Sequence, residues 1–280
     1  MKLSEKGNDL IVTQLDGFSL KDTLNCGQCF RWDEREDGSF FGVVKDKTLL
    51  IKQENDTLTL FNTTKQDFDN FWCEYFDFNT DYLKIKNLVC KDEIMKKASE
   101  FAGGIHILKQ EAWETLCSFI ISQNNNIPRI KGIISRLCET FGEEIESGVY
   151  SFPTAEKIAQ QTVESLAPLR SGFRAKYIID AAKKITNGEV NITRVRNSDF
   201  EKAKEELMTI LGVGTKVADC TLLFGFYKIQ AFPEDVWIKR AMATLYPNGL
   251  PEEYKQYGGV AQQYLFHYVR NFPEILKTHN

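Results

Sequence analysis

Lys216 is the residue of this sequence whose surroundings best suit nucleophilic chemistry. It lies in ELMTILGVGTKVADC (Glu206 to Cys220), two residues after Gly214. Helical spacing on both sides of LGVG predicts one helix that ends there and another that begins near Thr215. The positive end of the second helix's dipole disfavours the ammonium form of a first-turn lysine and so favours the nucleophilic amine. For a lysine taken alone, a solvated surface charge is the ordinary interpretation.

A carboxylate stands nineteen residues after this lysine, in AFPEDVWIKR (Ala231 to Arg240). Pro233 interrupts the chain, and Asp235 stands where the next helix should begin, so it is also an ordinary helix N-cap. A carboxylate held by helix N–H groups stays ionised, and beside a scissile glycosidic bond it stabilises positive charge that develops on the sugar. An amine and a carboxylate in this arrangement indicate chemistry at a sugar carbon.

The two glycines of LGVG predict a helix–hairpin–helix over about residues 201–226. Gly212 and Gly214 provide the positive φ and the close approach that a tight turn between helices needs. Free N–H groups at the start of the second helix form an anion site, which a DNA phosphate fills without any basic side chain. An ordinary αα-hairpin accounts for the glycines as well. A non-catalytic DNA-binding module is therefore the alternative function from another class.

The charge balance constrains the partner only weakly. Lysine and arginine total 35 and aspartate and glutamate 39, so the formal net charge is 35 − 39 = −4. An acidic chain argues weakly against nucleic acid, but binding depends on the local face, and residues 168–185 are locally basic. The beginning of the chain, MKLSEKGNDL, has no apolar segment of a secretory signal, and no run approaches the roughly 20 apolar residues of a membrane span. We therefore expect a cytoplasmic protein.

Cysteine and histidine usage argues against a metal centre. The chain has seven cysteines and three histidines, and only Cys26 and Cys29 form a CxxC pair. No second pair and no nearby histidine completes a zinc site, so we expect reduced, buried thiols and no metal ligands.

The elements that must position Lys216 and Asp235 fall into two groups, which predict an α+β fold. Residues 1–90 are expected to form a small, twisted, antiparallel β domain, with strands within 39–44 and 48–62 and most of the first eighty residues in β structure. The aromatic run FDNFWCEYFDF (Phe68 to Phe78) is expected to close this layer. The length of 280 residues also favours more than one domain.

Residues 91–280 are expected to form a mostly helical body that contains the hairpin. Apolar positions recur at helical spacing in the segments 91–103, 110–122, 126–140, 155–166, 174–186 and 200–210. Thr154 is the predicted N-cap of the helix that begins AEKIA, and Ser198 that of the helix near Glu201.

LGVGTKVADC followed by PED (Pro233 to Asp235) resembles the signature of the helix–hairpin–helix/Gly-Pro-Asp DNA glycosylase superfamily. Within it, the sequence most resembles the 8-oxoguanine DNA glycosylase/AP lyase family. Four further motifs stand in the expected order: NCGQCFRW (Asn25 to Trp32), SFIISQNNNIPRIKGIISRLCETFG (Ser118 to Gly142), SGFRAKY (Ser171 to Tyr177) and AQQYLF (Ala261 to Phe266). The resemblance covers most of the chain. The absence of a four-cysteine cluster excludes the iron–sulfur branch, and Lys216 argues against an alkylbase-type enzyme.

The resemblance implies that Lys216 attacks C1′ of the damaged nucleotide to give a Schiff base, from which the strand is cut by β-elimination. Asp235 would help to stabilise the sugar cation. The Gly27 carbonyl would read the lesion, because oxidation at C8 turns N7 of guanine from an acceptor into a donor. Phe266 and Cys220 would sandwich the flipped base. The implied base-binding set is Gly27, Cys220, Phe224, Pro233, Gln262 and Phe266.

The same resemblance implies contacts to the opposite strand and to the backbone. Asn124 would fill the space that the flipped base leaves, Arg129 and Arg174 would contact the orphaned cytosine, and Phe173 would act as a wedge. Taken outside this family, Phe173 would be a core residue and Arg174 a solvated charge. The implied DNA-binding set is Asn124, Asn125, Arg129, Phe173, Arg174, Gly212, Gly214 and Val217.

Three positions depart from the family pattern. Trp237 stands where the animal-type enzymes carry a phosphate-contacting histidine, Phe173 replaces a tyrosine, and Phe224 replaces a methionine of the base pocket. These differences bear on the preferred lesion rather than on the reaction class, and a glycosylase for a different purine lesion is the nearer alternative. We expect no catalytic metal, although the resemblance allows a monovalent cation on hairpin carbonyls near Val213. The expected partner is double-stranded DNA with 8-oxoguanine opposite cytosine, bound by a nucleoid-associated monomer.

Overall fold

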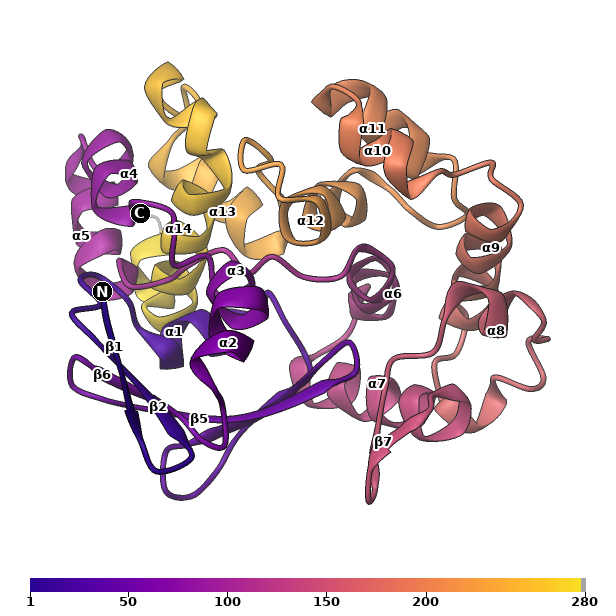
Figure 1. Cartoon of the computed structure of the whole chain (residues 1–280). Helices are drawn as coiled ribbons and strands as arrows, with labels where there is room; N and C mark the ends of the chain where they lie inside the picture. The colour runs from indigo at the N-terminus through magenta and orange to yellow at the C-terminus, as the bar shows by residue number, and fades with distance from the viewer. Residues whose placement is uncertain (278–280) are drawn as a thin grey trace.

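An antiparallel sheet of six strands is followed by a helical body in the computed structural model, which describes residues 1–277 (Figure 1). The strands lie in the order β1 (Lys2–Lys6), β2 (Asp9–Thr13), β6 (Thr57–Leu60), β5 (Lys47–Glu54), β4 (Phe40–Val44) and β3 (Trp32–Glu34). Ile51 pairs with Leu60 on one side and with Phe40 on the other, and all three side chains are buried on one face. The predicted α+β class is confirmed.

Helical turns, rather than strands, close the buried face of this sheet. They are α2 (Lys65–Asp67), the π-helical turn η1 (Phe68–Trp72) and α3 (Cys73–Tyr75). Thr64 and Asp67 form a capping box at the start, and the ring of Trp72 packs edge-on against Trp32 with centroids 6.4 Å apart. The aromatic run does close the layer, as expected. The expectation of β structure throughout the first eighty residues is wrong here and at α1 (Leu20–Asn25), because these residues carry N-caps and helical spacing.

The rest of the described chain is mostly helical. Its helices are α4 (Tyr82–Val89), α5 (Glu93–Ala102), α6 (Ala112–Ser122), α7 (Ile127–Phe141), α8 (Ala155–Ala159), α9 (Arg174–Thr186), α10 (Ile192–Asn197), α11 (Phe200–Met208), α12 (Thr215–Phe226), α13 (Val236–Leu245) and α14 (Gly258–Asn271). Short turns η2 (Ala167–Leu169), η3 (Glu252–Tyr257) and η4 (Pro273–Leu276) and a hairpin of β7 (Glu144–Glu146) and β8 (Val149–Tyr150) complete it. Among residues 1–277, no helix combines the length and the apolar character of a membrane span.

All six segments with helical spacing contain a helix, with two corrections at their ends. Thr154 caps α8 as predicted, by accepting a hydrogen bond from the Lys157 N–H at 3.2 Å. The helix expected over 155–166 ends at Ala159, where the chain turns. The cap of α11 is Asp199 and not Ser198, because the aspartate accepts from the Lys202 N–H at 3.0 Å. The division of the chain at residue 90 stays a prediction.

Helices α6 and α12 pack against each other in the middle of the helical body (Figure 1). Helices α8 to α11 lie on one side of this pair, and α4, α5, α13 and α14 lie on the other. Nearly every residue of α6 and α12 is buried. Gly225 permits the close approach, because a Cβ there would lie 3.1 Å from Ala112 Cα. The pair is therefore a rigid support for whatever stands at its ends.

The C-terminal end of α12 is tied to the N-terminal part of the chain by a buried carboxylate. Asp77 has no exposed surface. It accepts hydrogen bonds from the hydroxyls of Tyr82, at 2.8 Å, and Tyr227, and it pairs with Lys109 Nζ at 3.1 Å. Because each oxygen of the carboxylate is satisfied, burial of its charge is tolerated. The network fixes α12 relative to the sheet.

Acid should weaken the fold through His106, which lies in the segment between α5 and α6. Burial lowers the pKa of its imidazole to about 4, while the unfolded chain takes up this proton near pH 6.5. Stability from the neutral ring is therefore complete above about pH 6.5 and falls by roughly 3 kcal/mol as the pH drops to about 4. Urea unfolding across this range measures the slope, and a His106→Gln variant should show a shallower one. Equal slopes would contradict the assignment.

Candidate active site

A cleft of about 480 Å³ lies at the N-terminal end of α12. Its walls come from three stretches far apart in the sequence. They are the end of α6 with the following loop (122–125), the start of α12, and the residues around the start of α13 (234–239). Lys216 and Asp235 both line this cleft, together with Asn124, Asn125, Gly214 and Val217. The two residues that the sequence predicts to carry the chemistry therefore share one concave site.

Lys216 is partly buried in the first turn of α12. Its Nζ donates to Ser122 Oγ at 3.2 Å and lies 4.9 Å from the centre of the Phe119 ring. The helix begins at Thr215, as predicted, after Gly214, which has no side chain to cap it. Its first N–H groups are thus left for a ligand, and they face the same end of the helix as the lysine.

Asp235 is the N-cap of α13. Its Oδ1 accepts from the Ile238 N–H at 2.9 Å. Among residues 1–277 its Oδ2 accepts no hydrogen bond, so one carboxylate oxygen is held and the other is available to the cleft. Asp235 is therefore able to be both a helix N-cap and the predicted catalytic carboxylate, because the capping hydrogen bond fixes the carboxylate.

The Cys220 thiol lies one turn beyond Lys216 and is buried. Burial raises its pKa to about 11, a nearby Lys216 charge lowers it, and the carboxylates of Asp219 and Asp235 raise it. The thiol therefore stays protonated at neutral pH and is a neutral side chain rather than a second nucleophile.

The hairpin before α12 requires a glycine at position 212, whereas position 214 faces open space. Gly212 has φ +77°, and a Cβ there would lie 2.4 Å from the Tyr177 ring. Gly214 has an extended backbone, and a Cβ there would meet nothing within 4 Å. Lys204 on α11 pairs with Asp219 on α12 at 2.8 Å and holds the two helices of the hairpin together.

Four of the predicted base-binding residues form two pairs of neighbours, and a fifth, Phe224, is buried. At Gly27, with φ +86°, a Cβ would lie 3.7 Å from Phe266 Cε1. Gln262 donates to the Pro233 carbonyl at 3.0 Å, which joins α14 to the segment before Asp235. Phe224 is buried and stacks on Phe119 with centroids 5.4 Å apart. The motifs that are distant in sequence thus meet around α12.

Buried Gln28 explains why the Gly27 loop has a defined shape. Its amide nitrogen donates to the His106 carbonyl at 2.8 Å, and its side-chain oxygen accepts from the Leu108 N–H at 2.9 Å. These bonds hold the loop against the segment that leads to α6. The loop that contains Gly27 is therefore held by the backbone of another segment.

Arg174 braces the loop that carries Asn124. Its side chain is buried and donates to the carbonyls of Gln123 and Asn124, the latter at 3.1 Å. Asn124 adopts φ +47° and is exposed. Burial and the charge of nearby Arg129 lower the pKa of the Arg174 guanidinium. The two arginines and the asparagine assigned to the opposite strand are thus neighbours.

Phe173 and Val217 are the two remaining members of the predicted DNA-binding set. Phe173 is 48% exposed, and its ring centre lies 4.5 Å from Arg174 Cζ, so it is a surface residue and not part of the core. Val217 is buried and is one of the residues that line the cleft.

Five further residues line the cleft that the sequence did not single out: Ser122, Gln123, Glu234, Val236 and Lys239. Trp237, which the sequence marked as a departure from the family pattern, lines it as well. Ser122 and Gln123 lie inside a motif of the resemblance, and Ser122 is the first polar residue after the apolar run FII. That break in an apolar helix was the available signal. The contact between Ser122 and Lys216 could not be predicted from the sequence, because it depends on tertiary packing.

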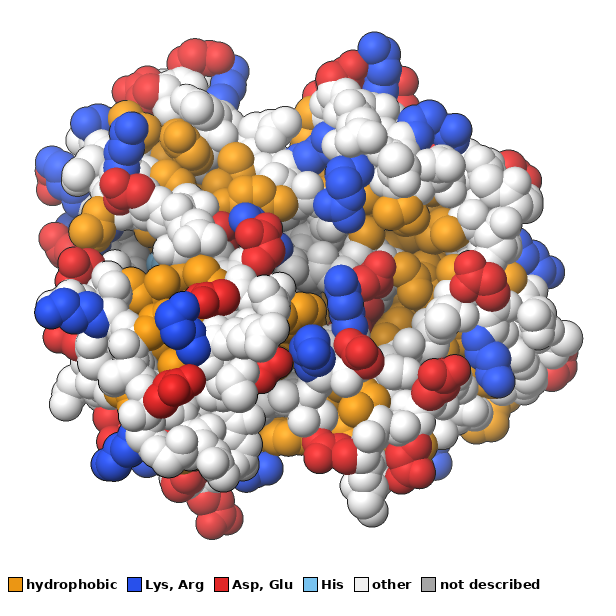
Figure 2. All heavy atoms as spheres, viewed as in Figure 1, with side chains coloured by type: hydrophobic (Ala, Val, Ile, Leu, Met, Phe, Trp, Pro, Cys, Tyr) orange, Lys and Arg blue, Asp and Glu red, His pale blue; other side chains and the backbone are white. Residues whose placement is uncertain are grey.

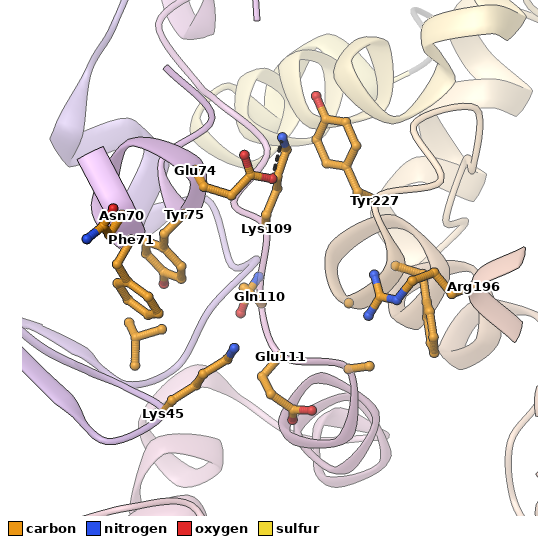
Figure 3. A pocket seen from close by; sticks show the side chains of 14 residues that line it. Lys45, Asn70, Phe71, Glu74, Tyr75, Lys109, Gln110, Glu111, Arg196 and Tyr227 are labelled. Atoms are coloured by element: carbon orange, nitrogen blue, oxygen red, sulfur yellow. Dashed lines mark hydrogen bonds and ion pairs between the residues drawn. The ribbon is translucent and has the colours of Figure 1, made fainter. Parts of the chain in front are cut away.

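A second cavity, of about 470 Å³, lies at the C-terminal end of α12 (Figure 3). It is lined by residues of the β4–β5 turn, α3, α10 and Gly225 to Tyr227. Lys109 and Glu74 form an ion pair across it at 2.9 Å. The face of the molecule shown in Figure 2 is hollowed near its middle, where positive and negative side chains are mixed. With a helix of about 16 Å between this cavity and Lys216, it is separate from the candidate active site.

Comparison with known proteins assigns both parts of the chain. The model of the 8-oxoguanine DNA glycosylase N-terminal domain matches residues 10–116. The model of the HhH-GPD superfamily base excision DNA repair protein matches residues 117–257. The chain belongs to the HhH-GPD superfamily of base excision DNA repair proteins, in the branch that carries the 8-oxoguanine DNA glycosylase N-terminal domain. The predicted family is confirmed.

Individual relatives agree with this assignment. The N-glycosylase/DNA lyase of Saccharomyces cerevisiae is 35% identical over 251 residues, which cover 79% of this chain and 66% of the yeast protein, slightly less than two thirds of its length. The Clostridium acetobutylicum 8-oxoguanine glycosylase/lyase, solved with dsDNA containing cytosine opposite to 8-oxoG, is 38% identical with a TM-score of 0.92, over 98% of this chain and 99% of that one. MBOgg1, solved with a low affinity DNA ligand, is 44% identical with a TM-score of 0.91, over 97% and 99%.

Substitutions of the two hairpin glycines should have different effects, one on the stability of the fold and the other on DNA binding. Gly212→Ala forces a side chain into positive φ and against Tyr177, so the free energy of unfolding should fall by about 2 kcal/mol or more. Gly214→Ala should leave it within about 0.5 kcal/mol, because the methyl group meets only open space. The same methyl group should weaken duplex binding about tenfold by obstructing a phosphate at the start of α12. Unfolding and fluorescence-anisotropy titrations measure both; unchanged binding by Gly214→Ala would exclude a phosphate there.

Proposed function

We propose that this protein is a bifunctional DNA repair glycosylase that excises 8-oxoguanine opposite cytosine and then cuts the strand at the resulting site. One observation carries the proposal: Lys216, a first-turn lysine at the start of α12, and Asp235, an N-cap aspartate, line the same cleft. A module that only held DNA by its phosphates would need the hairpin but neither side chain. The location expected from the sequence, in the cytoplasm and with the nucleoid, is part of this proposal.

The reaction follows from these two groups. The damaged nucleotide is extruded from the duplex, since C1′ cannot be reached within the base stack. The uncharged Lys216 amine forms a bond to C1′ while the C1′–N9 bond breaks, and the base leaves with the electron pair of that bond. The Asp235 carboxylate stabilises the positive charge on the sugar. Opening of the sugar ring and loss of a proton give the Schiff base, and loss of a proton from C2′ then expels the 3′ phosphate.

Base discrimination rests on the Gly27 carbonyl. The NCGQCF loop places Gly27 beside Phe266, and Gln28 holds the loop in place. A fixed acceptor pairs with the N7–H of 8-oxoguanine, whereas N7 of guanine would place a lone pair against it. A buried acceptor left without a donor is costly, so this contact rejects the normal base more strongly than a difference in size would.

The acidic net charge is compatible with a DNA partner because the site does not rely on total charge. Free N–H groups at the start of α12, with Lys239 at the cleft, provide local positive potential. The proposal requires no catalytic metal, since an amine and a carboxylate supply the chemistry. A monovalent cation on hairpin carbonyls near Val213 would support the hairpin and is included in the proposal on the family resemblance alone.

Lys216→Gln should abolish covalent chemistry and retain lesion recognition. The variant has no amine, so borohydride should trap no protein–DNA adduct, while affinity for an 8-oxoguanine duplex should stay within about threefold of the unsubstituted protein. Gel electrophoresis after borohydride and a binding titration measure the two quantities. Lys97→Gln, an exposed lysine of α5, is the matched control and should trap normally. Adduct formation by Lys216→Gln at the level of the control would refute the nucleophile.

Excision should be fastest when cytosine stands opposite the lesion. Exposed Arg129 lies near Arg174, which braces the Asn124 loop, and a guanidinium group is well suited to the acceptor atoms of an unpaired cytosine. Arg129→Ala should reduce the preference for cytosine by about tenfold, since one good side-chain contact to a base is worth about 1–3 kcal/mol. Single-turnover rates with each of the four opposite bases measure it. Equal rates opposite all four would contradict the assignment of both arginines.

Two simple assays distinguish the alternatives. Strand nicking of an oxidised duplex separates the enzyme from a non-catalytic hairpin module. A panel of purine lesions then separates an 8-oxoguanine enzyme from a glycosylase for a different purine lesion. Trp237, Phe173 and Phe224, at which the chain departs from the family pattern, make this panel informative.

A further inference from the structure

We propose that Ser122 is a positioning residue for the Lys216 amine, which it holds with its lone pair directed into the cleft. The inference rests on the proposed function, because it concerns the nucleophile of that reaction. Ser122 is the last residue of α6 and lines the cleft with Lys216 and Asp235.

The direction of the hydrogen bond follows from the single proton of the serine hydroxyl. Ser122 Oγ donates this proton to the Phe119 carbonyl at 2.8 Å, a bond back to its own helix. Its oxygen is then left as an acceptor for an N–H of Lys216 Nζ, which lies 3.2 Å away. The hydroxyl is therefore oriented before any substrate binds, and the lysine is the donor.

Phe119 provides the second contact that holds the Lys216 amine. Lys216 Nζ lies 4.9 Å from the centre of its ring. The ring is itself fixed, since it stacks on Phe224 at 5.4 Å and packs edge-on against Phe30 at 5.7 Å. A lysine side chain has many rotamers, and two fixed contacts select among them.

The hydrogen bond to Ser122 sets the direction in which the Lys216 amine is able to attack. A neutral amine has two N–H groups and one lone pair. When one N–H is donated to Ser122, at the end of α6, the lone pair is free to face the open side, where the sugar would be bound. Asp235 lines the same cleft. Ser122 thus contributes to the attack by orientation and does not itself touch the reacting atoms.

Ser122→Ala and Ser122→Thr form a matched pair for the test. Alanine removes the acceptor, whereas threonine keeps an Oγ that is able to make the same two hydrogen bonds. With an 8-oxoguanine·cytosine duplex, Ser122→Ala should lower the maximal single-turnover trapping rate about tenfold and leave the half-saturating DNA concentration within about twofold. Ser122→Thr should retain the rate within about threefold.

The outcomes are separable. A normal maximal rate in Ser122→Ala would overturn the positioning role and leave the proposed function intact, whereas absence of trapping by the unsubstituted protein would overturn the function. A change confined to the half-saturating concentration would assign Ser122 to DNA binding and also overturn the proposal. Thermal unfolding of each variant checks the fold. If the alanine variant does not fold, Ser122→Cys, of similar size but a weak acceptor, should show the same loss of maximal rate, and a normal rate would overturn the proposal.

Discussion

The packing of α12 against α6 is the constraint on which the rest of the site depends. Both helices are almost entirely buried, and Gly225 lets them approach closely. Their contact brings the N-terminus of α12 to the C-terminus of α6, so that Lys216 meets Ser122. A lysine at the start of an isolated helix would be a solvated charge. Here the neighbouring helix provides an acceptor and an aromatic face for it, and the lysine becomes a positioned group.

Buried polar groups hold the other segments to this pair. Gln28 fixes the loop of Gly27, Asp77 anchors the far end of α12, and Gln262 joins α14 to the segment before Asp235. Each of these side chains is buried and hydrogen-bonded, so displacement would leave unpaired polar atoms in the interior. The cleft is therefore preorganised by its surroundings, which suits a reaction in which an amine and a carboxylate must act from fixed places.

Local signals in the sequence were sufficient for most of the elements and insufficient at their ends. Helical spacing located six helices, and the glycines located the hairpin before α12. The errors have local causes. Ser198 and Asp199 are both good caps, and only the backbone geometry selects the aspartate. The expectation of mostly β structure in the first eighty residues fails over residues 65–75, because Thr64 caps a helical turn there.

The sequence by itself determined the family, because motif residues and their order along the chain carry that information. The same motifs identify Lys216 and Asp235 as the proposed nucleophile and carboxylate. The sequence also identified a turn at Gly212 that requires positive φ. Only the tertiary structure decided which side chains surround Lys216, that Arg174 braces the Asn124 loop, and that Gly27 lies against Phe266. The physical reason is that periodicity and capping act within about one turn of the chain, whereas these contacts join residues brought together by burial of the core.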